Sequence, residues 1–187
     1  MSKENLPANK SNNDSKTNDF KKRVYINLTE ISFCTGVGKI KEDYYSSSKN
    51  DYYSFGFRTV NGYQFNEHLS LGIGIGVDRY NNDATLLPIT FDARATIKKG
   101  RVSPVFTANA GYAIGLGSTI GQRSAKGGLV FNPQFGLKTY IHKNVACLFN
   151  IGYKWQTMEF SDVYGLYYYS NKDDIYKYIT ISTGFTF

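Results

Sequence analysis

From residue 24 to residue 187, apolar and polar residues alternate at every second position in one segment after another. Because successive side chains of a β-strand point to opposite faces, this period of two predicts strands with one apolar face and one polar face. Turn-forming residues separate the segments. We expect eight strands, at about 24–38, 52–65, 69–80, 86–97, 102–116, 128–141, 144–157 and 175–187.

The segment at 69–80 shows what kind of barrel these strands suit. One face carries Leu69, Leu71, Ile73, Ile75 and Val77, and the other carries Ser70, Gly72, Gly74, Gly76 and Asp78. A soluble barrel needs many Lys and Glu residues on its outer face, whereas small residues fit a crowded polar interior. The pattern favours a membrane barrel with its apolar face outward. A soluble, lipocalin-like ligand-binding barrel with its apolar face inward is the alternative.

The connections between the strands alternate between short and long. Short turns are expected at 66–68, 98–101 and 142–144, and longer loops at 39–51, 81–85, 117–127 and 158–174. Outer-membrane barrels have short periplasmic turns and longer extracellular loops. We therefore predict an all-β fold, an eight-stranded antiparallel up-and-down transmembrane β-barrel, over residues 23–187.

The first residues of the chain and its net charge limit the possible targeting signals and partners. Residues 1–22 have no periodicity and predict a disordered polar tail without the apolar core of a signal peptide, so an exported protein would have lost or replaced its signal. No run of about 20 apolar residues exists to form a membrane-spanning helix. The net charge of +7 suits an anionic partner such as phospholipid or lipopolysaccharide. Nucleic acid is not expected, because the basic residues form no stripe with stacking aromatic residues.

Charged residues on the polar face are the main candidate site. The alternation points seven of them into the lumen: Glu30, Arg58, Asp78, Asp92, Arg94, Lys138 and Lys154. Asp78 and Lys154 fall nearer the loop end than the others. Because an eight-stranded barrel has room only for packed side chains, we expect these groups to pair with one another. Such a network would fix the strand register as a salt-bridge plug, or would form a gated path for ions.

Catalytic and cofactor chemistry is not expected. The two histidines, His68 and His142, fall in short turns of non-adjacent hairpins. Cys34 and Cys147 fall on opposite faces of strands that are two apart around the barrel, so they predict neither a disulfide nor a metal site. We expect a protein that is not an enzyme and has no catalytic, metal-binding or cofactor-binding residues.

The last strand, YKYITISTGFTF, carries a family resemblance. Together with the hairpin FGFRTVNGYQFNEHLSLGIGIGVDRY, it resembles the small eight-stranded outer-membrane barrels, such as the OmpA membrane domain and OmpX, and the porin-family barrels. The resemblance implies a location in the outer membrane of a Gram-negative bacterium. It also implies that the outer-membrane assembly machinery recognises the terminal strand through Phe187, Phe185 and Ile181.

The loops give the leading hypothesis for function. Those at 39–51 and 158–174 mix Tyr with Lys, Asp and Ser, a composition suited to adaptable contacts with a surface protein or a glycan. Basic loop residues suit lipopolysaccharide phosphates. We therefore expect a non-enzymatic membrane scaffold, or a surface interaction or adhesion protein that acts through its extracellular loops. The alternative is a narrow channel or transporter for ions or small hydrophobic solutes.

Overall fold

A computed structural model describes residues 24–41, 47–81, 84–97, 102–116, 124–142, 145–164, 167–170 and 174–187. Its regular elements are all β-strands, so the described part of the chain holds no helix long and apolar enough to cross a membrane. The predicted tail at 1–22 and parts of the predicted loops lie outside the described residues.

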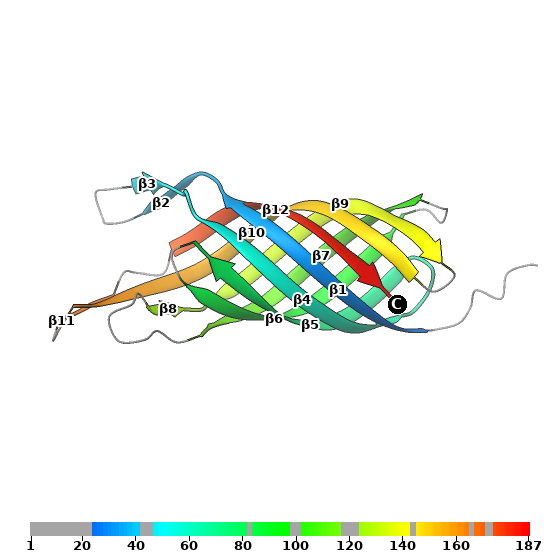
Figure 1. Cartoon of the computed structure of the whole chain (residues 1–187), viewed down its shortest axis with the longest axis horizontal. Helices are drawn as coiled ribbons and strands as arrows, with labels where there is room; N and C mark the ends of the chain where they lie inside the picture. The colour runs from blue at the N-terminus through cyan, green and yellow to red at the C-terminus, as the bar shows by residue number, and fades with distance from the viewer. Residues whose placement is uncertain are drawn as a thin grey trace, which may run out of the picture.

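Eight long strands form a closed barrel (Figure 1). They are β1 (Val24–Gly36), β4 (Tyr53–Gln64), β5 (Leu69–Tyr80), β6 (Thr85–Thr96), β7 (Val102–Gly115), β9 (Leu129–His142), β10 (Val145–Tyr164) and β12 (Asp174–Thr186). Each pairs antiparallel with the next, and β12 also pairs with β1, which closes the ring. The predicted eight-stranded up-and-down barrel is confirmed.

Four short strands extend the barrel at the end with the long loops (Figure 1). β2 (Lys39–Lys41) pairs with β3 (Ser47–Lys49), while β8 (Ser124–Lys126) and β11 (Tyr167–Ser170) pair with the end of β10. The loops predicted at 39–51 and 158–174 therefore contain strand pairs. The C-terminus lies at the opposite end, with the short turns.

The alternation places the apolar side chains outside and the polar ones inside. In β5, Ile73, Ile75 and Val77 are exposed, whereas Asp78 is buried. The same sorting recurs in β12, where Ile181 and Phe185 are exposed. An apolar outer wall is the arrangement of a membrane barrel. It does not fit the alternative of a soluble barrel, whose apolar face would point inward.

Aromatic side chains gather towards both ends of the outer wall. At the loop end, the Phe33 ring centroid lies 5.1 Å from that of Phe55. At the turn end, the rings of Tyr63 and Phe65 are 5.3 Å apart. Such belts mark the two interfaces between membrane and water. They delimit the part of the wall that spans the membrane.

Candidate functional site

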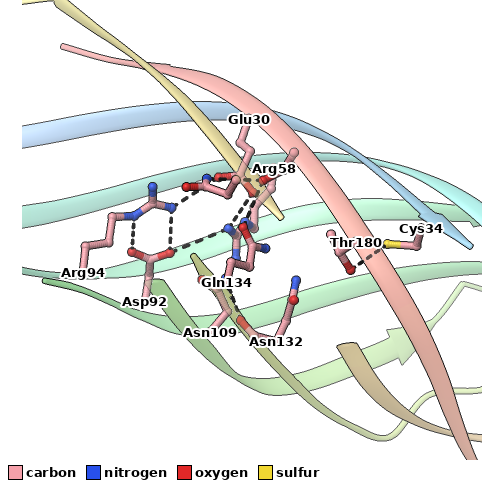
Figure 2. A network of polar contacts seen from close by, with 11 residues as sticks. Glu30, Cys34, Arg58, Asp92, Arg94, Asn109, Asn132, Gln134 and Thr180 are labelled. Carbon is pink, nitrogen blue, oxygen red and sulfur yellow. Dashed lines mark hydrogen bonds and ion pairs between the residues drawn. The ribbon is translucent and has the colours of Figure 1, made fainter. Parts of the chain in front are cut away.

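Four charged side chains meet in the middle of the lumen (Figure 2). Glu30 of β1 lies opposite Arg58 of β4, and its Oε1 accepts a hydrogen bond of 2.9 Å from Arg58 Nη2. Arg94 of β6 donates to both carboxylate oxygens of Asp92, at 2.7 and 3.0 Å. Arg94 Nη2 also lies 3.3 Å from Glu30 Oε2, so the two pairs form one cluster. We call these four residues the central charge cluster.

Small residues on β5 make this cluster possible. β5 lies between β4 and β6, and its lumen face carries Gly72, Gly74 and Gly76. A Cβ atom at Gly74 would lie 3.5 Å from Arg58 Cδ and 3.1 Å from Thr90 Oγ1. Because no side chain rises from β5 here, Arg58 reaches over it towards β6. The alternating glycines of β5 therefore allow the Arg58 side chain to pass close to the β5 backbone.

The central charge cluster is electrically balanced. Glu30 and Asp92 supply two negative charges and Arg58 and Arg94 two positive ones, and all four side chains are largely shielded from solvent. Buried charges that are paired and hydrogen-bonded avoid the large cost of isolated ones. The arrangement rigidly ties β1, β4 and β6 together across the lumen.

A second ion pair lies nearer the loop end, between Lys154 of β10 and Asp78 of β5. Lys154 Nζ donates to Asp78 Oδ2 at 2.5 Å and to the Tyr80 hydroxyl at 3.1 Å, and it lies 5.6 Å from the Tyr80 ring centroid. The sequence predicted both charges towards this end but not the Tyr80 contact. Tyr80 is the last residue of β5 and lies two positions after Asp78. This even spacing was the only sequence signal that its side chain points into the lumen.

Lys138 lies opposite two buried lumen residues but apart from the central charge cluster. The alternation grouped this residue with the lumen charges, but its ammonium lies 5.1 Å from the centroid of the Tyr140 ring. No ion pair among the described residues joins it to the central charge cluster. The register explains the separation, since Lys138 lies opposite Ser103 and Leu148. These positions belong to a layer nearer the turn end.

Two clusters of buried apolar residues lie in the lumen on either side of the charges. At the turn end, the layer consists of Leu28, Val60, Val105 and Leu148. At the loop end, a larger layer comprises Cys34, Ile40, Tyr80, Ala84, Leu86, Ala113, Met158, Tyr176 and Tyr178. We call them the lower and upper apolar layers. Ile40 belongs to β2, so the β2–β3 hairpin helps to cover the opening.

Four buried amide side chains also point into the lumen. Asn109, Asn132, Gln134 and Asn150 are each at most 9% exposed. Asn109 Nδ2 donates to the Asn132 carbonyl at 3.4 Å, while the side-chain oxygens of Asn109, Asn132 and Asn150 have no hydrogen-bond partner among the described residues. Sequence reasoning missed this group, although each member occupies a lumen position in its strand. Groups of this kind are the ones that internal water satisfies in proteins.

The remaining reactive residues stand apart from one another. Cys34 is buried, with its Sγ 3.4 Å from Thr180 Oγ1, whereas Cys147 is half-buried, and neither forms a disulfide. His68 is exposed at a turn, with Nδ1 2.8 Å from the Thr96 carbonyl oxygen. Within the described ranges, no three residues of the His, Cys, Asp or Glu type gather in a way that could hold a metal ion.

The residues predicted to guide assembly lie on or directly after β12, the strand that pairs with β1 to close the barrel. Phe185 and Ile181 point outward from β12. Phe187 continues the pairing beyond β12, since its N–H donates to the Asn27 carbonyl at 2.8 Å and its carbonyl accepts from the Asn27 N–H at 3.1 Å. The terminal aromatic residue is therefore held in the wall at the turn end.

Solved structures with this architecture share little sequence with the chain. The crystal structure of Neisserial surface protein A matches with a TM-score of 0.59 at 14% identity, covering 87% of this chain and 95% of that one. The outer-membrane protein AlkL, solved in lipid bilayers, matches with 0.59 at 12%, covering 100% and 97%. OprG from Pseudomonas aeruginosa matches with 0.56 at 13%, covering 87% and 95%.

The fold is that of a small outer-membrane β-barrel. The expected resemblance is confirmed at this level. No protein-family model matches the chain, and no curated protein matches it in sequence. The likeness therefore rests on three-dimensional structure.

Proposed function

We propose that this chain is a non-enzymatic outer-membrane barrel that acts as a membrane scaffold or a surface interaction protein through its loop end. The observation that carries the proposal is the pairing of the lumen charges between two apolar layers. The lower and upper apolar layers enclose a charge cluster whose acids and bases are paired. A lumen packed in this way stabilises the wall and leaves the outer surfaces and loops for contact with partners.

The outer membrane of a Gram-negative bacterium is the proposed location. The apolar outer wall suits lipid, and the fold is shared with outer-membrane proteins. Outer-membrane lipid, lipopolysaccharide and the assembly machinery are then the expected partners. The chain's net charge of +7 favours the anionic headgroups among them.

The loop end offers the proposed contact surface. β10 continues past the barrel to pair with β11, so a strand pair projects beyond the wall (Figure 1). β11 contains three consecutive tyrosines, Tyr167–Tyr169. Tyrosine supplies a large amphipathic contact area at low conformational cost, which suits binding to a surface protein or glycan.

Conductance in a planar bilayer tests whether the two apolar layers block the lumen. We expect the full-length wild-type protein to give no steady current steps, because ions would have to cross both apolar layers. The control is Leu28→Ser with Leu148→Ser, which makes only the lower layer polar and should still give no steady steps, because the upper layer is unchanged. Steady wild-type steps that disappear in Arg58→Ala or Glu30→Ala would instead establish the alternative of a narrow channel.

Adhesion tests the contact surface. Cells that display the protein would be compared for binding to lipopolysaccharide-coated and glycan-coated surfaces. Replacing Tyr167–Tyr169 with Ser should reduce binding. The control replaces Tyr25, Tyr63 and Tyr140 with Ser, because these exposed tyrosines lie at the turn end. Equal loss in both variants, or binding unchanged by the first, would contradict the proposal.

A further inference from the structure

The β2–β3 hairpin lies at the loop end, where β1 leaves the wall of the barrel (Figure 1). Its two strands form a sheet of their own, in which Lys39 lies opposite Lys49 and Lys41 opposite Ser47. Among the described residues, no strand ladder joins this small sheet to the sheet of the barrel. A segment without such a ladder can open locally while the sheet beside it stays intact.

Two buried side chains fasten the hairpin to the barrel. Ile40 of β2 is 5% exposed and belongs to the upper apolar layer. Asn50, directly after β3, is 1% exposed, and its Nδ2 donates to the Lys177 carbonyl of β12 at 2.8 Å. The backbone N–H of Asn50 also donates to the Gly38 carbonyl at 3.0 Å, which closes the base of the hairpin. Each strand of the hairpin thus has one attachment to the barrel.

Asn50 occupies space beside Cys34 on the inner face of β1. Cys34 and Gly36 are two positions apart in this strand, so they share the lumen face. A Cβ atom at Gly36 would lie only 2.6 Å from Asn50 Cγ and 2.6 Å from its carbonyl oxygen. Asn50 therefore takes the place that a side chain at position 36 would fill. The attachment of the hairpin lies next to the buried thiol.

The chain enters the hairpin through a residue suited to a hinge. Gly38 has a φ of 80°, a backbone conformation that favours glycine, and a Cβ atom there would meet nothing within 4 Å. The backbone bonds of the wall end just before it. The Gly36 N–H donates to the Tyr52 carbonyl at 2.7 Å, and the Val37 N–H donates to the Lys177 carbonyl at 2.8 Å. The hairpin can therefore turn at Gly38 without breaking these bonds.

We propose that the β2–β3 hairpin is a hinged cap over the upper apolar layer, held in place by Ile40 and Asn50. Opening turns the hairpin about Gly38 and withdraws both side chains together. A small water-soluble solute that arrives from the loop end then reaches Cys34. The cap thus controls entry into the loop-end half of the lumen. This inference concerns the mouth of the lumen and does not depend on what the loops bind.

The rate of thiol labelling at Cys34 tests the cap. The full-length protein with Cys147→Ser would be folded in detergent micelles and exposed to a small charged thiol reagent. Asn50→Ala removes the bond to Lys177 and should speed labelling about fivefold, because one lost hydrogen bond shifts the balance of closed and open states by roughly this factor. Ile40→Ser should speed it about tenfold or more, because an apolar anchor is lost from the upper layer.

Matched controls replace the exposed neighbours of the two anchors. Asp51 follows Asn50, and its 75% exposed side chain pairs with Lys49, so Asp51→Ala should leave the labelling rate unchanged. Lys39, which precedes Ile40, is also exposed, and Lys39→Ser should have equally little effect. Gly36→Ala provides a second route to the same result, since its Cβ atom would displace Asn50 and should also speed labelling.

Urea unfolding separates cap opening from loss of the whole barrel. Asn50→Ala should leave the urea midpoint nearly unchanged, and its labelling rate should stay constant at urea concentrations well below that midpoint, because the cap opens locally. Three results would overturn the proposal. Cys34 could be labelled as slowly in both anchor variants as in the parent protein, Asp51→Ala could speed labelling as much as Asn50→Ala, or labelling could rise in step with global unfolding.

Discussion

Arg58 and Asp92 approach to 3.7 Å between Nη2 and Oδ2, although the whole of β5 separates their strands. The approach is possible because β5 presents glycine at the lumen positions between them, at Gly72, Gly74 and Gly76. In a barrel this narrow, the residues that have no side chain decide which charges can meet. The central charge cluster thus depends on β5 as much as on its own members.

Removing one acid from the central charge cluster should destabilise the barrel strongly. Glu30→Gln leaves Arg58 and Arg94 with one carboxylate between them, and breaking a buried pair in this way typically costs about 3–5 kcal/mol. Urea titration of the protein folded in vesicles measures the loss. The control is Lys138→Met, which should change the free energy of unfolding by less than about 1 kcal/mol, because Lys138 lies outside the cluster. Equal losses of unfolding free energy in the two variants would contradict the placement of Lys138 outside the central charge cluster.

Lys154 and Asp78 should be energetically coupled. Lys154→Met leaves the Asp78 carboxylate unpaired, and Asp78→Asn leaves the ammonium unpaired, so each single change should cost about 3–5 kcal/mol. The double variant should cost less than the sum of the two, by about 0.5–3 kcal/mol. A double-mutant cycle of unfolding free energies checks this. Additive losses would show that the pair contributes no coupling.

Because the apolar face of the wall points outward, the cost of an Arg substitution on that face should depend on its depth in the membrane. Arg in place of Ile73, in the middle of β5, should cost about 2–4 kcal/mol, whereas Arg in place of Ile97, just beyond β6 at the turn end, should cost about 0–1 kcal/mol. The two side chains are similarly exposed, at 66% and 63%, so depth is the main difference between them. Unfolding in vesicles measures both. A small cost at Ile73 would contradict a lipid-facing position there.

The terminal strand predicts a difference between assembly in cells and folding in vesicles. Phe187→Ala keeps the backbone pairing with Asn27 and removes the terminal ring. We expect fewer folded barrels in the outer membrane and nearly unchanged spontaneous folding into vesicles. In both the outer membrane and the vesicles, the folded fraction is measured as the share of protein whose electrophoretic mobility changes on heating. Phe149→Ala is the control. If it impaired assembly as much as Phe187→Ala does, the terminal ring would have no special role in assembly.

The burial of Cys34 in the upper apolar layer predicts that its thiol is protected. This thiol is 3% exposed and belongs to the upper apolar layer, so a small water-soluble thiol reagent should label it far more slowly in the folded barrel than in urea. Cys147→Ser removes the second thiol and leaves Cys34 as the only one. In that background, opening the upper layer with Leu86→Ser should speed labelling. Rapid labelling before that change would show that the lumen is open to water.

The alternation in the sequence determined the strands, their inward and outward faces and the all-β barrel. It did so because a period of two is a local property that each strand carries in its own residues. It also pointed Glu30, Arg58, Asp92 and Arg94 to one interior. Lys138 shows the limit of this reasoning, because the face of a residue does not give its height in the barrel.

Only the tertiary structure decided which inward residues meet. Register between strands sets height, and it brings Asp78 of β5 to Lys154 of β10, 76 positions later in the chain. The extension of β10 beyond the wall also emerged only from the strand pairing. The sequence by itself thus determined the faces of the strands, because side-chain direction is local, whereas closure of the ring determined the contacts, because they join strands distant in the chain.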